Sequence, residues 1–171
     1  MSDFLPRITT PSGLPTWGGD FDDAIDSFAA SVMRATSVDP VITELVRLRC
    51  AQYHDCRLCG SLRLNEAVEQ GVDEATVAKI PHHEASDLSD AAKVALRLVD
   101  VMIIRPASAS GELREELREH FTESQIAEIC LDVAKWSQQK YLVALRVETP
   151  PWNGLGTLTF DEDGNPQIRS D

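Results

Sequence analysis

Two cysteines three positions apart are the residues of this sequence best suited to chemistry. Cys56 and Cys59 lie in HDCRLCGSLR, residues 54–63, directly after His54 and Asp55. Two thiols one helical turn apart can bind a metal ion, cycle between dithiol and disulfide, or simply fill space in a core. A thiolate near a helix N-terminus is stabilised by unpaired backbone N–H groups and by the helix dipole. The spacing alone leaves all three uses open.

The metal-binding use has little support elsewhere in the sequence. Zinc takes four nitrogen or sulfur ligands, and His82 and His83, the further candidates, are adjacent residues of a predicted loop that rarely both point at one ion. Cys130 lies on an apolar helical stripe and is expected in the core, and Cys50 is expected in the core or near the site. The segment DEDGN at 161–165 lacks the later ligands of a calcium loop and is better explained as a hairpin turn. We therefore expect no metal, and no organic cofactor is required for thiol chemistry either, since the cysteines themselves would carry the electrons.

Composition and charge narrow the class of protein. The chain has 171 residues, of which 43% are hydrophobic and 26% charged, as in a globular domain. Its net charge of −12 repels phosphate backbones and anionic lipid, so we expect neither nucleic-acid nor membrane partners. The first residues lack the pattern of a secretory signal, which favours a cytoplasmic location where thiols are kept reduced. A close cysteine pair there is more often catalytic, redox-sensing or metal-binding than a structural disulfide.

Helical periodicity dominates the sequence and predicts an all-α protein. An extended arm is expected over 1–19, with three prolines and three glycines, a helical domain over 20–149, and a tail or β-hairpin over 150–171 around an Asp-Gly turn. The expected helices begin at Asp20, at Pro40 after Asp39, at Asp55 (ending before Gly71), at Asp73 (followed by a loop over 82–88), after Ser89, at Ser110, and at Thr122 with a capping box to Gln125, the last running to about Val147.

The stretch ELVRLRCAQYHDCRLCGSLRLNEAVEQGV, residues 44–72, resembles the carboxymuconolactone decarboxylase superfamily, and within it the alkylhydroperoxidase-D-like branch. That branch carries a Glu, a C-x-x-C twelve residues later, and a His four residues after the second Cys. Glu44, Cys56 and Cys59 match this pattern, and Arg63 stands where the His is expected. The block FTESQIAEICLDVAKWSQQKYLVALRVE also resembles the family's last long helix. The resemblance covers about residues 20–150 and implies an alkylhydroperoxidase-D-like helical bundle.

The resemblance also implies roles for the matching residues. Cys59 would be the attacking thiolate, Cys56 the resolving thiol, and Glu44 the base or the group that orients it. In the family the His is interpreted as a proton relay between the Glu and the second cysteine. Arginine does not deprotonate under physiological conditions, so Arg63 would instead stabilise a Cys59 thiolate by charge or bind an anionic substrate. His54 is the nearest replacement base, although a polar turn residue is the simpler interpretation.

The expected activity is that of a thiol-dependent peroxidase or disulfide reductase of the antioxidant type. Its substrate would be a hydroperoxide or a disulfide, and a thioredoxin-like or lipoyl-bearing partner would regenerate the dithiol. We also expect a homo-oligomer, as a dimer, a trimer or a multiple. Two alternatives remain: a cofactor-free lactone decarboxylase of the same superfamily, and a non-redox small-molecule-binding or assembly protein. Decarboxylase members do not depend on a C-x-x-C, so the two cysteines favour thiol chemistry.

Overall fold

A computed structural model describes residues 20–138 and 152–170 of the chain. The arm predicted at 1–19 and the end of the long helix predicted at 139–147 lie outside these residues. The helices are α1 (Asp20–Met33), α2 (Pro40–His54), α3 (Arg57–Gly60), α4 (Asn65–Glu69), α5 (Glu74–Val77), α6 (Asp90–Ile104), α7 (Gly111–His120) and α8 (Glu123–Ser137), with 3-10 turns at Ile80–Ala85 and Pro106–Ser108. The strands are β1 (Leu62–Leu64), β2 (Gly156–Phe160) and β3 (Pro166–Ser170). The predicted mostly helical fold with a small hairpin is confirmed.

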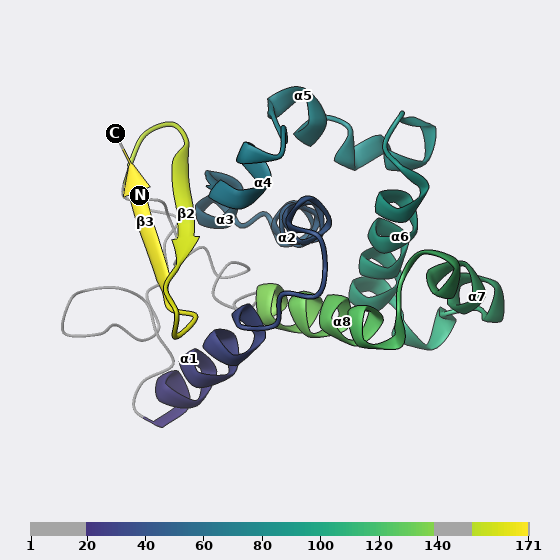
Figure 1. The fold of residues 1–171 in the computed structure, drawn as a ribbon, viewed down its shortest axis with the longest axis horizontal. Helices are drawn as coiled ribbons and strands as arrows, with labels where there is room; N and C mark the ends of the chain where they lie inside the picture. The colour runs from purple at the N-terminus through teal and green to yellow at the C-terminus, as the bar shows by residue number, and fades with distance from the viewer. Residues whose placement is uncertain (1–19, 139–151, 171) are drawn as a thin grey trace, which may run out of the picture.

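Helix α2 lies at the centre of the fold and packs against α6 and α8. Figure 1 shows α2 end-on, with α6 and α7 on one side of it and the β2–β3 hairpin on the other. The core that these helices share is built from apolar side chains at helical spacing, including Leu45, Leu48, Leu96, Val99, Ile129 and Val133. Burying one such side chain stabilises the fold by about 1.5–3 kcal/mol. Residues of α2 are therefore held in fixed positions relative to α8.

The predicted helix starts are confirmed where the signal is local. The Asp39 carboxylate accepts a hydrogen bond from the Val41 N–H at 2.8 Å, with Pro40 at the first helical position. Thr122 and Gln125 form the predicted capping box at the start of α8. Such caps satisfy backbone N–H groups that the first helical turn leaves without partners.

The single helix predicted from Asp55 to residue 70 is wrong. The chain instead forms α3, β1 and α4. A buried ion pair on α2 explains the interruption, because it binds the backbone of this segment. The Arg47 guanidinium donates to the Cys59 carbonyl at 2.7 Å and to the Leu62 carbonyl at 2.6 Å, and the Glu44 carboxylate accepts from the Leu64 N–H at 3.2 Å. Backbone groups bound in this way are not available to a continuous helix.

The predicted hairpin is present, and β1 adds a third strand that sequence analysis did not predict. Strands β2 and β3 are antiparallel, with Leu158 opposite Ile168, whereas β1 pairs with β2 in parallel, with Leu62 opposite Gly156. Gly164, in the hairpin turn with φ +83°, lies so close to α1 that an added Cβ would be 2.3 Å from the Ala30 carbonyl oxygen. The hairpin therefore packs against α1 and against β1, which belongs to the segment 55–70 that carries the two cysteines (here called the cysteine segment).

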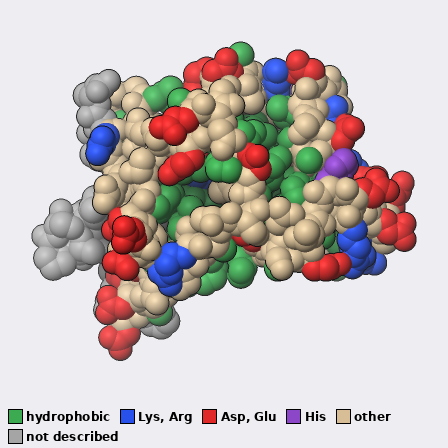
Figure 2. Space-filling view, viewed as in Figure 1, with side chains coloured by type: hydrophobic (Ala, Val, Ile, Leu, Met, Phe, Trp, Pro, Cys, Tyr) green, Lys and Arg blue, Asp and Glu red, His purple; other side chains and the backbone are tan. Residues whose placement is uncertain are grey.

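Hydrophobic side chains gather in a hollow at the centre of one face, and acidic side chains are spread around its edge (Figure 2). The acidic groups agree with the net charge of −12. No helix within residues 20–138 and 152–170 has the length and apolar character needed to cross a membrane.

Candidate thiol site

The two cysteines lie at the start of α3, where the sharp turn after α2 places them. Asp55 ends α2 in the left-handed conformation, with φ 51° and ψ 38°, and Cys56 becomes the N-cap of α3. The Cys56 sulfur accepts a hydrogen bond from the Cys59 N–H at 3.2 Å. Cys56 is 5% exposed and Cys59 is more accessible. The N–H group stabilises a thiolate on Cys56, as expected for a sulfur at a helix N-terminus.

The two thiols border different cavities. Cys59 lines a cavity of about 300 Å³, here called the Cys59 cavity, between α1, α8 and the hairpin. Its walls are largely apolar and include Leu58, Leu62, Trp136, Leu158, Phe160 and Ile168, and its charged lining residues include Arg47 and Lys135. Cys56 lines a more open cavity of about 420 Å³ on the other side of α3, here called the Cys56 cavity. Cys59 therefore borders the more enclosed of the two cavities, whereas Cys56 faces more open space.

Glu44 and Arg47 form a buried ion pair behind the cysteines. Glu44 is 0% exposed and Arg47 is 1% exposed, and two hydrogen bonds of 2.6 and 2.8 Å join them. Burial opposes the charge of Arg47, but hydrogen bonding and attraction to Glu44 outweigh burial and raise its pKa above the usual value. Thiolates at Cys59 and Cys56 act in the same direction. Arg47 is therefore a permanent cation, and by the same attraction it favours thiolates at both cysteines.

A second buried pair of charged groups lies on α8. Lys135 and Asp132 are 6% and 3% exposed. Burial lowers the pKa of Lys135 to about 7, while attraction to Asp132 and to a Cys59 thiolate works against this decrease. Burial also raises the pKa of Asp132 to about 7, with a further increase from Glu128. The Lys135 Nζ lies 3.0 Å from the centre of the Trp136 ring, so a cation at this position is stabilised by the aromatic face.

Comparison with known proteins agrees with this geometry. Residues 19–101 match the sequence model of the carboxymuconolactone decarboxylase family, and this segment contains Glu44 and both cysteines. Over residues 19–101 the chain is similar to this family.

Relatives and solved structures extend the comparison. Two uncharacterised proteins from Mycobacterium tuberculosis, strains CDC 1551 and H37Rv, are each 31% identical over 168 residues, covering 88% of this chain. The chain spans 59% of the length of these relatives. A crystal structure from Agrobacterium tumefaciens, of a protein of unknown function suggested to be the antioxidant defence protein AhpD, is similar with a TM-score of 0.65 and 19% identity, covering 77% of this chain and 91% of that one. This likeness shows that the family fold here is AhpD-like.

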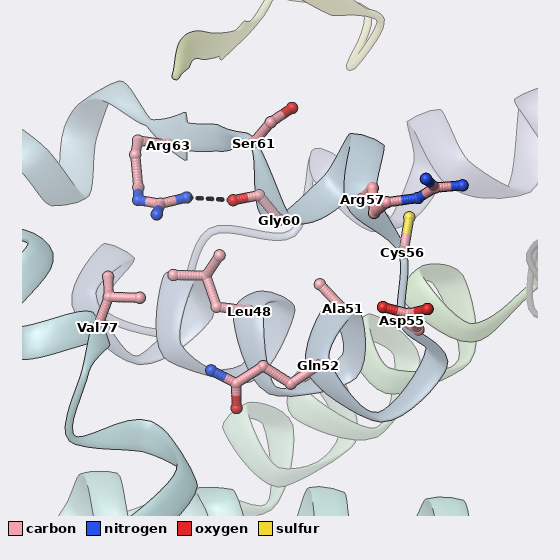
Figure 3. Close-up of a pocket in the computed structure, with 10 residues that line it drawn as sticks. All are labelled: Leu48, Ala51, Gln52, Asp55, Cys56, Arg57, Gly60, Ser61, Arg63 and Val77. Atoms are coloured by element: carbon pink, nitrogen blue, oxygen red, sulfur yellow. Dashed lines mark hydrogen bonds between the residues drawn. The ribbon is translucent and has the colours of Figure 1, made fainter. Parts of the chain in front are cut away.

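Arg63, at the position of the family His, lies in the Cys56 cavity. Its guanidinium donates to the Glu74 carboxylate at 2.7 and 2.8 Å and to the Gly60 carbonyl at 2.7 Å. Figure 3 shows Arg63 and Cys56 at opposite ends of this cavity, with Gly60 between them. Arg63 does not line the Cys59 cavity, where the buried cations are Arg47 and Lys135.

His54 lies at the end of α2, outside both cavities. One ring nitrogen is 2.9 Å from the Ser137 hydroxyl, so the side chain joins α2 to α8. Cys50, one turn earlier, is completely buried, and burial raises the pKa of its thiol to about 12. Burial also raises the pKa of the Cys130 thiol. Cys50 lies in the core, whereas Cys130 is half-buried and packs against it, and both are poor nucleophiles at neutral pH.

The described residues contain no cluster of three or more His, Cys, Asp or Glu side chains that could hold a metal ion. His83 is buried in the 3-10 helix Ile80–Ala85, which occupies much of the predicted loop, and its Nδ1 lies 3.2 Å from the Ile80 carbonyl. Pro81 at the start of this helix favours the helical turn that a loop prediction missed.

Proposed function

We propose that this chain is a thiol-dependent peroxidase or disulfide reductase in which Cys59 and Cys56 alternate between dithiol and disulfide. The observation that carries the proposal is the difference in surroundings of the two cysteines. Cys59 borders the more enclosed, largely apolar cavity beside a permanent cation, Arg47, and Cys56 is the nearby sulfur that accepts the Cys59 N–H. The arrangement supports attack by Cys59 and resolution by Cys56.

The proposed cycle has three steps. The Cys59 thiolate attacks the terminal oxygen of a hydroperoxide, the O–O bond breaks, and a sulfenic acid and an alcohol form. Cys56 then attacks the sulfenic sulfur, and a disulfide and one water molecule form. An external dithiol reduces the disulfide and is itself oxidised to a disulfide. That dithiol would belong to a thioredoxin-like or lipoyl-bearing partner, and the apolar walls of the Cys59 cavity favour organic hydroperoxides over hydrogen peroxide.

Intact-protein mass after brief exposure to tert-butyl hydroperoxide, with a sulfenic-acid trap present, tests the proposal. Wild type is expected to lose two thiols per chain and to regain both with dithiothreitol. Cys59→Ser should form no disulfide, and Cys56→Ser should carry one trapped adduct on Cys59. Cys130→Ser is the control and should behave as wild type, because Cys130 is half-buried against the core and is not part of the pair.

Two results would contradict the proposal in different ways. A trapped adduct in Cys59→Ser and none in Cys56→Ser would reverse the roles of the two sulfurs. Wild type that keeps both thiols through many equivalents of oxidant would eliminate the redox couple. The decarboxylase and the binding-protein alternatives would then be the ones to test.

A further inference from the structure

Chemistry at Cys59 needs a group that exchanges protons, and the family His is replaced by Arg63. Of the two buried cations that line the Cys59 cavity, Arg47 cannot serve, because a guanidinium does not release its proton and this one is bound to Glu44 by two hydrogen bonds. Lys135 is the other. It reaches the cavity from α8, an element different from the one that carries position 63.

We propose that Lys135 is a catalytic residue that takes the proton of the Cys59 thiol and returns it to the alkoxide that leaves when the O–O bond breaks. This inference rests on the proposed peroxidase function. Lys135 lines the same cavity as Cys59, is 6% exposed, and has no carboxylate oxygen within 4 Å among the described residues. Aromatic rings surround its amine instead, with Nζ 3.0 Å from the centre of Trp136 and 5.3 Å from that of Phe160.

The electrostatic surroundings allow Lys135 to both accept and donate a proton near neutral pH. An exposed lysine holds its proton too firmly to act as a base at pH 7, but burial lowers the pKa of Lys135 to about 7. Asp132 and a Cys59 thiolate favour its charged form, whereas Arg47 opposes it. Asp26 of α1 also lines the cavity. Asp132, Cys59 and Arg47, which come from α8, α3 and α2, together keep both protonation states of Lys135 accessible.

The proton and the electrons balance through the oxidation step. The neutral Lys135 amine takes the proton from the Cys59 S–H, which leaves a thiolate beside an ammonium group. The thiolate donates an electron pair to the terminal peroxide oxygen, the O–O bond breaks, and the sulfur becomes a sulfenic acid. The ammonium group then protonates the departing alkoxide, which leaves as an alcohol, and Lys135 is neutral again. One proton has moved from sulfur to product oxygen.

Two reactions of the same thiol separate proton transfer from electrostatic support. Alkylation by iodoacetamide needs a thiolate but no proton donor, because iodide leaves unprotonated, whereas tert-butyl hydroperoxide needs both. The rates of both reactions are measured from about pH 5 to about pH 9. This range spans the ordinary pKa of histidine and stays below the ordinary pKa of lysine. Lys135→Arg keeps a cation that does not release its proton. We expect alkylation within about threefold of wild type, and a hydroperoxide reaction slower by about 10²-fold or more.

Lys135→Met should slow both reactions and move the alkylation midpoint to higher pH. If this variant does not fold, as judged by far-UV circular dichroism, the double variant Asp132→Asn/Lys135→Met removes both charged groups and should show the same two losses. Lys93→Met, at a lysine on α6 that does not line the cavity, is the matched control and should react as wild type.

A Lys135→Arg variant that reacts with the hydroperoxide as fast as wild type would overturn the assignment, and so would equal slowing of both reactions, which indicates a structural role. Wild type that does not react with the hydroperoxide at all would overturn the proposed function itself. Wild type that reacts, with Lys135→Arg reacting equally fast, would overturn only the role of Lys135.

Discussion

Replacing Glu44 with glutamine tests whether the buried ion pair on α2 holds the cysteine segment in place. Glutamine can still accept the Leu64 N–H, so the substitution mainly removes the negative charge opposite Arg47. Because both side chains are at most 1% exposed, the guanidinium would be left in the core without a counter-charge, bonded only to neutral groups such as the Cys59 and Leu62 carbonyls. Removing one partner of a buried pair costs about 3–5 kcal/mol. The free energy of unfolding of a native protein is about 5–15 kcal/mol, so this loss is a large fraction of the total stability.

Urea unfolding followed by far-UV circular dichroism measures this loss. The matched control is Asp100→Asn, which breaks the ion pair of Asp100 with Arg49, a residue on the same helix, at 2.7 and 3.0 Å. These two side chains are 24% and 14% exposed, so water compensates part of the change and we expect a loss of about 1 kcal/mol. Equal losses in Glu44→Gln and Asp100→Asn would refute the structural role of the buried pair. All samples need one protein concentration, since oligomerisation changes apparent stability.

The same Glu44 variant reports on proton transfer where it remains folded. If the carboxylate acts as the base or orients it, hydroperoxide oxidation of Cys59 should slow while the disulfide with Cys56 still forms, because no sulfur has been removed. An unchanged oxidation rate in folded protein would restrict Glu44 to its structural contacts with Arg47 and the Leu64 N–H.

Three further predictions concern charge, pH and assembly. The charge role of Arg63 stays a prediction: Arg63→Ala should slow alkylation of Cys59 at neutral pH, and an unchanged rate would leave Arg63 as the partner of Glu74. Burial raises the pKa of Asp132 from 3.8 and lowers that of Lys135 from 10.5, each to about 7. Compared with the unfolded chain, the native protein therefore holds an extra proton on Asp132 below pH 7 and lacks a proton on Lys135 above pH 7. The free energy of unfolding should consequently fall as pH rises toward 7 and rise again beyond it. Asp132→Asn/Lys135→Met should lack this minimum and be more stable at pH 7 by about 1–4 kcal/mol; denaturant unfolding across pH that shows the same minimum in both proteins would contradict this. Light scattering should give a dimer, a trimer or a multiple, and a mass near one chain of 18.9 kDa at micromolar concentration would exclude the oligomer.

Sequence predicts those elements whose boundaries depend on neighbouring residues. Asp39 and Pro40 begin α2 and Thr122 with Gln125 begins α8, because each cap acts within one turn. The helix predicted over 55–70 is wrong because the structure of this segment depends on residues far along the chain. Its residues have good helix propensity, but Glu44 and Arg47 bind its backbone, and β1 pairs with β2 far along the chain. Tertiary contacts of this kind override local propensity and cannot be found from local patterns.

The cysteine pair and Glu44 are visible in the sequence because their spacing matches the family pattern. The buried charged residues of α8 are not predicted from the sequence, although their spacing is informative. Glu128, Asp132 and Lys135 follow one another at spacings of four and three, so they share one helical face next to the predicted apolar stripe. Charged residues at helical spacing beside a core stripe indicate either a solvated edge or a buried polar cluster. Only the packing of α1 and α2 against α8, with Phe160 of the hairpin beside Lys135, decides for the buried cluster, in which all three residues are at most 6% exposed.

The two cations of the Cys59 cavity should affect its chemistry in different ways. Arg47 keeps its charge at every physiological pH, so its support of a thiolate adds a constant term and no pH dependence of its own. Lys135 changes charge near pH 7, so its support appears only while it is protonated. A neutral lysine with a thiol and an ammonium with a thiolate differ only in the position of one proton. The two groups therefore titrate as a pair, and apparent pKa values of the reaction belong to the pair and not to either residue. In wild type the pH dependence of the reaction should therefore show two titration steps. Lys135→Met should leave only one, the titration of the thiol, because Arg47 does not release its proton and cannot supply the other.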